Sequence, residues 1–448
     1  MPNTRWRKIH QFLAVSGQGK VQSAFDVFQP NADLDTRDAC DIEQSDNVNR
    51  EPEYDCDGVD LINEPIRSRF TQFRLTYNKI NAQILARWIA YHQGTAGASS
   101  GAVANEVQTL TRNGTVSGGT FTISLTHEGK TGTTEAIAYD ASTATILAAL
   151  LKKSGSANAM GKLLKPGDVT VGGTWGTAIT LTFAGRYAAA NMTEVTTDDT
   201  NLTGGGSLDV ATSTPGDSEL HAISRTSDGS LPVFSIATGD KNESVATQKY
   251  GNCSVDSISW TGEQGQNLQV TVVINAYYVP ESEDSTFDVP ACTNITPIKV
   301  QDCRISINGT YQTGDVYRIA GELNNNIPTE AGFGFDDIDQ TVAWQRGDIP
   351  TQTFPMSIYG SSDDALYTLC ADEETQAEVA VVQYFGFGGN RVTITASTAQ
   401  LMFQQNRLSF EGALRQSCIN LTASPHGSPP LTYAYNGSQT ASFLVASS

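Results

Sequence analysis

Apolar and polar side chains alternate with a period of two along residues 249–278, KYGNCSVDSISWTGEQGQNLQVTVVINAYY. This alternation predicts two β-strands, and the glycine-bearing stretch 262–265 predicts a turn between them. The side chains assigned to the apolar face are Ile258, Trp260, Leu268, Val270, Val272 and Ile274, and Asp256 has the same parity as Ile258. A hairpin with one apolar face needs a second layer to cover it. We expect the rest of the chain to supply that layer.

The preceding chain predicts a hairpin over residues 12–28, an acidic arm over 33–64, a strand over 66–77 and then a helix. The arm carries twelve acidic and two basic residues, and it is too long and polar for an ordinary connection. Asn78 is the expected N-cap of the helix, and Gly94 is its expected end. The apolar residues at helical spacing are Ile80, Ile84, Leu85, Trp88 and Ile89.

A separate module is predicted over residues 104–215, because low-complexity sequence borders it on both sides. We expect strands over 119–126, 168–171 and 178–183 and a helix over about 142–152. The chain then resumes with a strand over 231–237 that leads into the central hairpin.

The same order of elements then recurs. The expected counterparts are a hairpin of 304–307 and 316–323 around the turn Asn308-Gly309, the strand of Phe354, Met356 and Ile358, a short helix through about Cys370, the strand 378–385, and a hairpin of 390–395 and 406–414. We therefore predict a mainly β protein with two repeats, each with a flanking helix, and a small inserted β-rich (α+β) domain. The predicted boundaries are 1–103 with 216–289, then 104–215, then 290–448.

Composition narrows the possible functions. The chain of 448 residues has a formal net charge of −20, and such a surface repels nucleic acid. No apolar run approaches about 20 residues, so no membrane span is predicted, and the first residues do not predict a signal peptide. The seven cysteines are scattered without a CxxC pair, so no zinc site is expected.

Three local motifs resemble catalytic or ligand-binding sequences, and each lacks part of its pattern. Residues 97–101 match G-x-S-x-G but lie in a predicted linker rather than a strand-to-helix turn. Residues 53–64 resemble a calcium loop, yet the loop begins with Glu53 and Pro65 follows it directly. Gly129-Lys130-Thr131 resembles the end of a P-loop, but Ser124 replaces the required glycine. We therefore expect no catalytic residues, no cofactor and no metal site.

The central hairpin, the helix QILARWIAYHQG before it and DCRISINGTYQTGDVYRIAGELNNNI after it resemble phage tail tube proteins, in the form with a duplicated tube fold. The 104–215 block resembles a small β-rich, Ig-like module inserted in phage structural proteins. The resemblance implies two β-sandwich or barrel repeats, a non-enzymatic role as a siphovirus tail tube subunit, and stacked rings that form the channel for genome delivery.

The resemblance also implies partners and a location. The partners are copies of the chain in trimeric rings with pseudo-sixfold symmetry, the tape measure, terminator and distal tail proteins, and phage DNA that passes through the lumen without specific binding. The location is the virion tail, after synthesis in the host cytoplasm. The alternative is a tail, baseplate or adhesin-like surface-binding module.

Two sets of acidic residues are the site candidates. The acidic arm is expected to reach the neighbouring ring through Asp38, Asp41, Glu43, Asp46, Glu51, Asp55, Asp57 and Asp60. Asp256 and Glu411 are candidates for lumen charge, although a one-residue change of strand register turns each to the opposite face.

Overall fold

The computed structural model describes residues 10–14, 40–50, 53–54, 61–63, 66–96, 103–153, 155, 158–226, 231–239, 248–277, 297–312, 316–327, 333–334, 337–341, 351–360, 365–371, 378–411, 416–426 and 430–437. These residues form a mainly β, antiparallel protein, as the alternation predicts.

The elements outside residues 104–217 are β1 His10–Ala14, β2 Cys40–Arg50, β3 Glu53–Tyr54, β4 Leu61–Asn63, β5 Ile66–Tyr77, α1 Ala82–Gln93, β6 Gly94–Ala96, β16 Glu219–Arg225, β17 Phe234–Gly239, β18 Gln248–Glu263, β19 Gln269–Tyr277, η3 Val300–Asp302, β20 Arg304–Ile307, β21 Thr310–Tyr311, β22 Val316–Asn324, β23 Phe333–Gly334, β24 Asp337–Thr341, β25 Thr351–Tyr359, α4 Ala365–Ala371, β26 Glu378–Phe387, β27 Asn390–Glu411, β28 Gln416–Pro425 and β29 Thr432–Gly437.

Those between 104 and 217 are β7 Val107–Asn113, β8 Gly118–His127, β9 Lys130–Thr133, β10 Ile137–Ala138, α2 Thr143–Leu150, α3 Met160–Leu163, β11 Val169–Thr174, β12 Ala178–Phe183, η2 Gly185–Tyr187, β13 Thr196–Asp198, β14 Leu202–Thr203 and β15 Ser207–Thr214.

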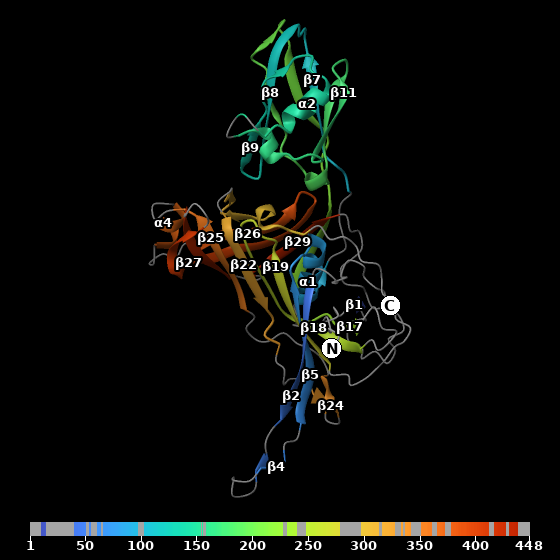
Figure 1. Ribbon diagram of the computed structural model, residues 1–448, viewed down its shortest axis with the longest axis vertical. Helices are drawn as coiled ribbons and strands as arrows, with labels where there is room; N and C mark the ends of the chain where they lie inside the picture. Colours follow the sequence, from blue (N-terminus) through green and yellow to red (C-terminus); the bar gives the residue numbers. More distant parts are fainter. Residues whose placement is uncertain are drawn as a thin grey trace, which may run out of the picture.

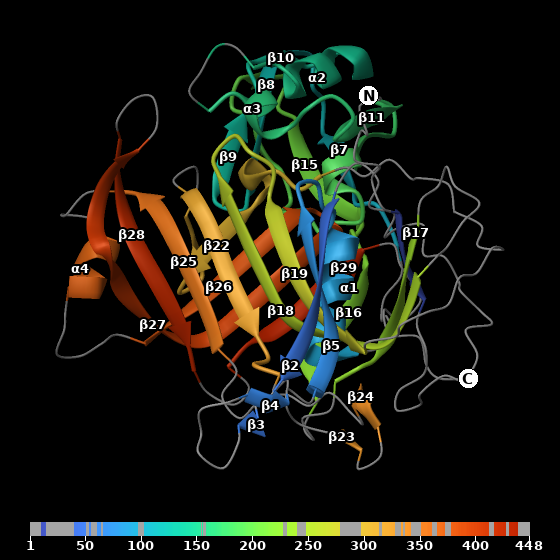
Figure 2. The ribbon, with the colours of Figure 1, turned by 60° about the horizontal axis from the view of Figure 1, so that its bottom comes forward.

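One large sheet forms the main body and folds over into two layers (Figure 2). The front layer runs β2-β5-β19-β18-β22-β25-β28, and β26, β27 and β29 cross behind it. One continuous core fills the space between the layers, with Phe73, Val272, Met356 and Val392 among its fully buried members. The second layer that the central hairpin requires is therefore supplied by the later strands of the chain.

The same strand order occurs twice in this sheet. The first strand set pairs in the order β1-β17-β18-β19-β5-β2. The second strand set pairs in the order β20-β26-β27-β28-β25-β22. In both sets a helix, α1 or α4, follows the third strand along the chain. The recurrence read from the sequence is therefore also a recurrence of strand pairing.

Two predicted hairpins of the second set differ from the structure. Strand β20 turns at Asn308-Gly309, both with positive φ, into the short β21, whereas β22 leaves to pair with β18 and β25. The predicted strands 390–395 and 406–414 are instead joined in the single 22-residue strand β27, whose hairpin partner is β28. No glycine or proline interrupts residues 390–411, so the chain bends through an irregular pairing between Phe403 and Leu408 without turning back.

A bulge in β18 changes the predicted parity of the central hairpin. The register shifts between Val255 and Ser257, so Val255 and Ile258 both point into the core. A bulge residue has no partner of its own and re-aims the side chains on either side. Asp256 is that residue, and it does not share the apolar face with Ile258 and Trp260 as the alternation implied. In β19, Leu268, Val270, Val272 and Ile274 are all fully buried, as predicted.

Helix α1 lies between the layers with Trp88 fully buried at its centre. Trp88 Nε1 donates a hydrogen bond to Tyr77 Oη at 3.1 Å. The N-cap is Asn81, whose side chain accepts from Ile84 N at 2.7 Å, and not Asn78 as predicted. Asn78 lies in the turn before the helix, and its Oδ1 accepts from Gln269 Nε2 at 3.0 Å. Gly94 ends the helix with φ 107°, as expected for a C-cap glycine.

The two strand sets join through a ladder between β18 and β22. It runs from Ser257 opposite Asn324 to Glu263 opposite Arg318. Trp260 lies opposite Gly321 in this ladder, packs against Phe354 and Phe385, and donates from Nε1 to Gln383 Oε1 at 3.0 Å. A side chain at position 321 would overlap the indole, because an added Cβ would lie 2.1 Å from Trp260 Cζ2.

Residues 104–217 form a unit with its own sheets and core, which we call the 104–217 unit. Its strands make a five-stranded and a four-stranded sheet, and Phe121, Ile146 and Phe183 are among its buried core residues. Its two ends meet in a bridge in which Ala104 and Asp217 exchange backbone hydrogen bonds of 2.9 Å. Helix α2 begins at the cap Ser142, whose Oγ accepts from Thr145 N, in agreement with the prediction.

The 104–217 unit and the β2–β5 ribbon lie at opposite ends of the molecule (Figure 1). Strands β2 and β5 pair in one register from Cys40 opposite Tyr77 to Asn49 opposite Ser68, and the ribbon extends away from the body. Residues 40–50 of the predicted acidic arm thus form a regular strand, and β3 pairs with β4 farther along the same arm.

We expect Gly321→Ala to lower the free energy of unfolding by about 1–3 kcal/mol, since overpacking at a filled site forces side chains and backbone to shift. Urea denaturation followed by tryptophan fluorescence measures the change. Gly176→Ala is the control, because the nearest atom to an added Cβ there is 4.0 Å away. Equal stability of the two variants would contradict the close packing at the β18–β22 ladder.

Candidate functional site

Among the strand edges of the large sheet that have no partner among the described residues, two are long, those of β2 and of the second half of β27. Strand β2 pairs with β5 on one side only. In β27, pairing with β26 ends at Gln400, so the stretch 401–411 has β28 on one side and no described strand on the other. Open edges present unpaired N–H and C=O groups that template pairing with another chain. These edges are therefore candidate assembly surfaces.

Large apolar side chains are exposed along the β27 edge. Phe410 is 75% exposed and Leu408 is 39% exposed, and both fall in the stretch whose outer side is open. Leu408 lies opposite the fully buried Ile419, so it has the parity of the core face. Leu408 and Phe410 therefore lie beyond the part of this face that the hydrophobic core covers.

The face of the front layer opposite the core is polar, and its charges alternate in sign. Arg74 of β5 lies opposite Glu43 of β2, and Arg318 of β22 lies opposite Glu263 of β18. Opposite charges directly across a strand pair attract one another. Glu322, the register partner of Ser259, adds one further acidic residue. Of these residues, sequence analysis named only Glu43, as an arm residue, because the pairings join strands that are far apart in the chain.

The structure describes the two predicted lumen residues, Asp256 and Glu411, to different extents. Asp256 is mostly buried at the β18 bulge, and its Oδ1 accepts from Ile327 N at 3.0 Å. Burial raises the pKa of this carboxyl group, and its hydrogen bond to Ile327 N ties the chain after β22 to the β18 bulge. Glu411 is the last residue of β27 and pairs with Gln416, and its side chain lies outside the described residues.

The predicted arm residues are only partly described. Asp41, Glu43 and Asp46 lie in β2, and Glu43 is exposed. The others lie outside the described residues, namely Asp38, Glu51, Asp55, Asp57 and Asp60. Most of the calcium-like loop and the G-x-S-x-G stretch also fall outside them.

A buried ion cluster joins the 104–217 unit to the second strand set. Glu128, at the turn between β8 and β9, forms ion pairs with Arg391 of β27 and, at 3.6 Å, with Arg304 of β20. The Glu128 side chain is only 6% exposed. Burial lowers the pKa of Arg391 to about 10, so the guanidinium that the body brings into this contact stays charged at neutral pH. The turn is the Glu128-Gly129 hairpin turn between β8 and β9, in which both residues have positive φ.

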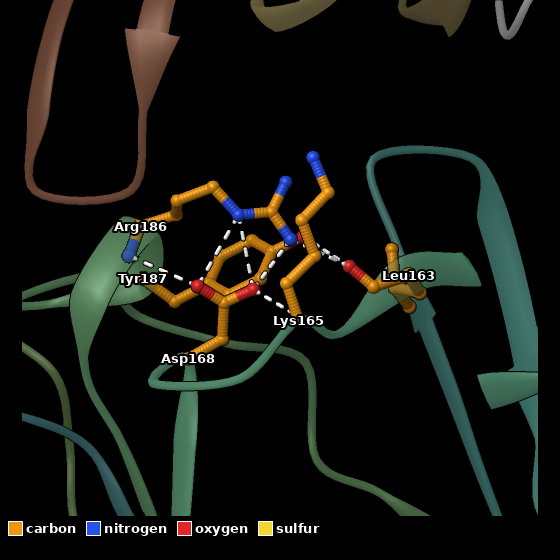
Figure 3. A network of polar contacts seen from close by, with 5 residues as sticks. All are labelled: Leu163, Lys165, Asp168, Arg186 and Tyr187. Atoms are coloured by element: carbon orange, nitrogen blue, oxygen red, sulfur yellow. Dashed lines mark hydrogen bonds and ion pairs between the residues drawn. The ribbon is translucent and has the colours of Figure 1, made fainter. Parts of the chain in front are cut away.

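A polar network holds the adjoining η2 turn of the unit in place (Figure 3). The Asp168 carboxylate accepts from Lys165 N at 2.8 Å, from Arg186 N at 3.2 Å and from the Arg186 guanidinium. Arg186 Nη2 also donates to Leu163 O at 2.9 Å. This network fixes the backbone around Tyr187. The η2 turn, through which the 104–217 unit contacts the body, is therefore preorganised.

The ordered turn packs against the β26–β27 connection of the body. Tyr187 meets Phe387 edge to face at 6.0 Å, and the Arg186 guanidinium lies 4.8 Å from the centre of the Phe387 ring. Gly389 N donates to Ala188 O at 2.9 Å. An added Cβ at Gly389 would lie 2.5 Å from Ala188 O, so the backbones approach too closely for a larger residue.

His127 faces this junction from the unit side. Its ring lies 5.4 Å from that of Tyr187, and it lines a cavity of about 390 Å³ together with Arg391, Asp217 and Asn436. Burial, and then the positive charges of Arg391 and Arg304, lower the pKa of His127 to about 4. The histidine is therefore neutral at pH 7.

Within the described part of the chain, no group of three or more His, Cys, Asp or Glu residues is arranged to hold a metal ion. Over the same residues, no helix is long and apolar enough to cross a membrane. No protein-family model matches this chain, and a search of curated proteins finds no significant match.

We expect Glu128→Ala to lower the free energy of unfolding by about 3–5 kcal/mol, because it leaves two buried arginines without their counter-charge. Calorimetry measures the loss and also detects separate melting of the 104–217 unit. The control is Glu135→Ala, which removes an ion pair with Lys152 whose side chains are 52% and 46% exposed. An exposed pair contributes at most about 1 kcal/mol. Similar losses in both variants would contradict a buried junction.

Acid should weaken the structure through His127. Because its folded pKa of about 4 lies below the ordinary value of 6.5, the unfolded chain binds more protons between these values. The His127 contribution is complete above pH 6.5, and up to about 3 kcal/mol is lost as the pH falls towards 4. His127→Gln should flatten this part of the stability–pH profile relative to His426→Gln, a change at an exposed position. Identical profiles would contradict a buried neutral His127.

Proposed function

We propose that this chain is a structural virion protein, a subunit of a siphovirus-type phage tail tube with a duplicated tube fold and an inserted β-rich module. The observation that carries the proposal is the repeated strand order with its two open edges. Each strand set is one tube fold, comprising a sheet, a flanking helix and a strand that crosses between layers. The chain has no catalytic role in this proposal and acts by assembly.

The proposed assembly follows from the β18–β22 ladder. Inside the chain, the fifth strand of the first set, β18, pairs with the second strand of the second set, β22. The corresponding strands left open are β27 of the second set and β2 of the first. If β27 of one copy pairs with β2 of the next, every joint in the ring, within a chain or between chains, connects strands at the same two places in the strand order. A head-to-tail interface of this kind closes into a ring, and three chains provide six tube folds.

The polar face of the sheet suits a channel for DNA. Positive charges on a channel wall bind phosphates by releasing counterions, which slows a moving duplex. Arg74 and Arg318 each have a glutamate as register partner, so neither is an unopposed positive charge on this face. Together with the chain's net charge of −20, this supports a net negative or neutral bore through which DNA passes without specific binding.

Two parts of the chain, the β2–β5 ribbon and the 104–217 unit, project from the main body. The acidic β2–β5 arm contacts the neighbouring ring along the tube, and the 104–217 unit faces outward as a separately folded module. The partners are further copies of the chain and the tape measure, terminator and distal tail proteins, and the location is the virion.

Negative-stain electron microscopy of the concentrated protein tests the proposal. We expect stacked rings or tubes with sixfold features built from three chains. Phe410→Lys should leave the protein folded but abolish rings, since it places a charge on the open β27 edge. The matched control is Val103→Lys, which changes an exposed apolar residue at the base of the 104–217 unit and should still assemble. Dispersed particles from the unmodified protein at high concentration would overturn the proposal.

A further inference from the structure

The two strand sets can be aligned residue by residue through their buried strands. Leu75 of β5 pairs with Val272 of β19, and Met356 of β25 pairs with Leu421 of β28. All four side chains are buried at the same place in their respective sets. These two pairs are therefore structural equivalents, and the flanking strands can be aligned outward from them.

Alignment of the outer strands follows from the same ladders. Trp260 of β18 pairs with Val270, and Leu408 of β27 pairs with Ile419, so Trp260 corresponds to Leu408. On the other side, Ile42 of β2 pairs with Leu75, and Ile319 of β22 pairs with Met356. Ile42 therefore corresponds to Ile319, and the residue type is the same at both positions.

The internal ladder then supplies the register of the open one. Gly262 pairs with Ile319 and Trp260 pairs with Gly321 across β18 and β22. Replacing each residue by its equivalent, we infer that Phe410 of one chain pairs with Ile42 of the next, and Leu408 with Gln44, in an antiparallel β27–β2 ladder between copies. This inference rests on the proposed function and adds the register of its interface.

The chemistry along this ladder agrees with the inferred register. Phe410, the most exposed large apolar residue of the described chain, lies opposite an isoleucine. Arg407 lies opposite Ser45 and diagonal to Glu43, within reach of a long side chain. Glu411 lies opposite Asp41, where the internal ladder has Glu263 opposite Arg318. At this position the inferred ladder does not repeat the charge complementarity of the internal ladder.

A cross-link between these positions can form only between two copies. Within one chain, β27 and β2 are separated by seven strand steps through β28, β25, β22, β18, β19 and β5. At about 4.8 Å a step, this distance is roughly 34 Å along the sheet. A disulfide requires Cα atoms within about 7 Å.

Paired cysteines test the register in a Cys40→Ser background, which removes the native thiol of β2. Phe410→Cys with Ile42→Cys should form disulfides on mild oxidation of assembled rings, giving dimers and trimers on a non-reducing gel. A second pair on the same face, Leu408→Cys with Gln44→Cys, should form the same disulfide-linked dimers and trimers. It keeps the test valid if the first double variant does not fold. The slipped pair, Phe410→Cys with Glu43→Cys, places the thiols on opposite faces and should cross-link several-fold less.

The outcomes separate this inference from the proposed function. Rings that cross-link mainly through the slipped pair overturn the inferred register and leave the tube proposal standing. Cross-linked species of more than three chains on the non-reducing gel overturn the closed ring of three. Dispersed, uncross-linked protein from both the parent and the paired variants overturns the proposed function itself.

Discussion

The architecture depends on one backbone ladder, between β18 and β22, which makes a single sheet out of two strand sets. At its centre the indole of Trp260 occupies the space above Gly321, and its N–H is satisfied by Gln383 from the back layer. Gln383 Nε2 in turn donates to Ala320 O at 3.3 Å, so the same side chain bonds both strands of the ladder. A buried polar group needs such partners to offset its desolvation. The contact of Trp260 with Gly321 and Gln383 therefore fixes both the pairing of β18 with β22 and the distance between the two layers.

The ladder also explains why two edges stay open. The β18–β22 ladder joins one strand of the first set to one strand of the second. The open edges on β27 and β2 belong to the strands that hold the corresponding places in the strand order of the two sets. Natural sheets usually protect such edges, because an open edge is a site of unwanted pairing. An open edge lined by Leu408 and Phe410 is consistent with a surface that is covered in an assembly.

The 104–217 unit is fixed by a different kind of interaction. It is inserted between α1 and β17 of the first strand set, yet it docks on β20 and the β26–β27 connection of the second. A buried carboxylate between two arginines contributes little net stability but strongly disfavours alternative placements that leave a charge unpaired. The Asp168–Arg186 network and the close approach of Gly389 to Ala188 add shape to this charge complementarity. The unit thus connects the two strand sets as well as interrupting one of them.

The sequence by itself determined the elements whose signals are local. Alternation located β5, β19, β25 and β26, Gly94 ended α1, and Ser142 began α2. Tertiary structure alone decided the β18 bulge, the continuity of β27 and the ionic contact of Glu128. Glu128 and Arg391 are 263 residues apart, and a glutamate in a hairpin turn carries no local sign of a buried partner. A bulge likewise depends on what the neighbouring strand offers, so alternation alone assigned Asp256 to the wrong parity. Period and capping are properties of a few adjacent residues, whereas register and charge pairing are properties of segments that meet only after the chain folds.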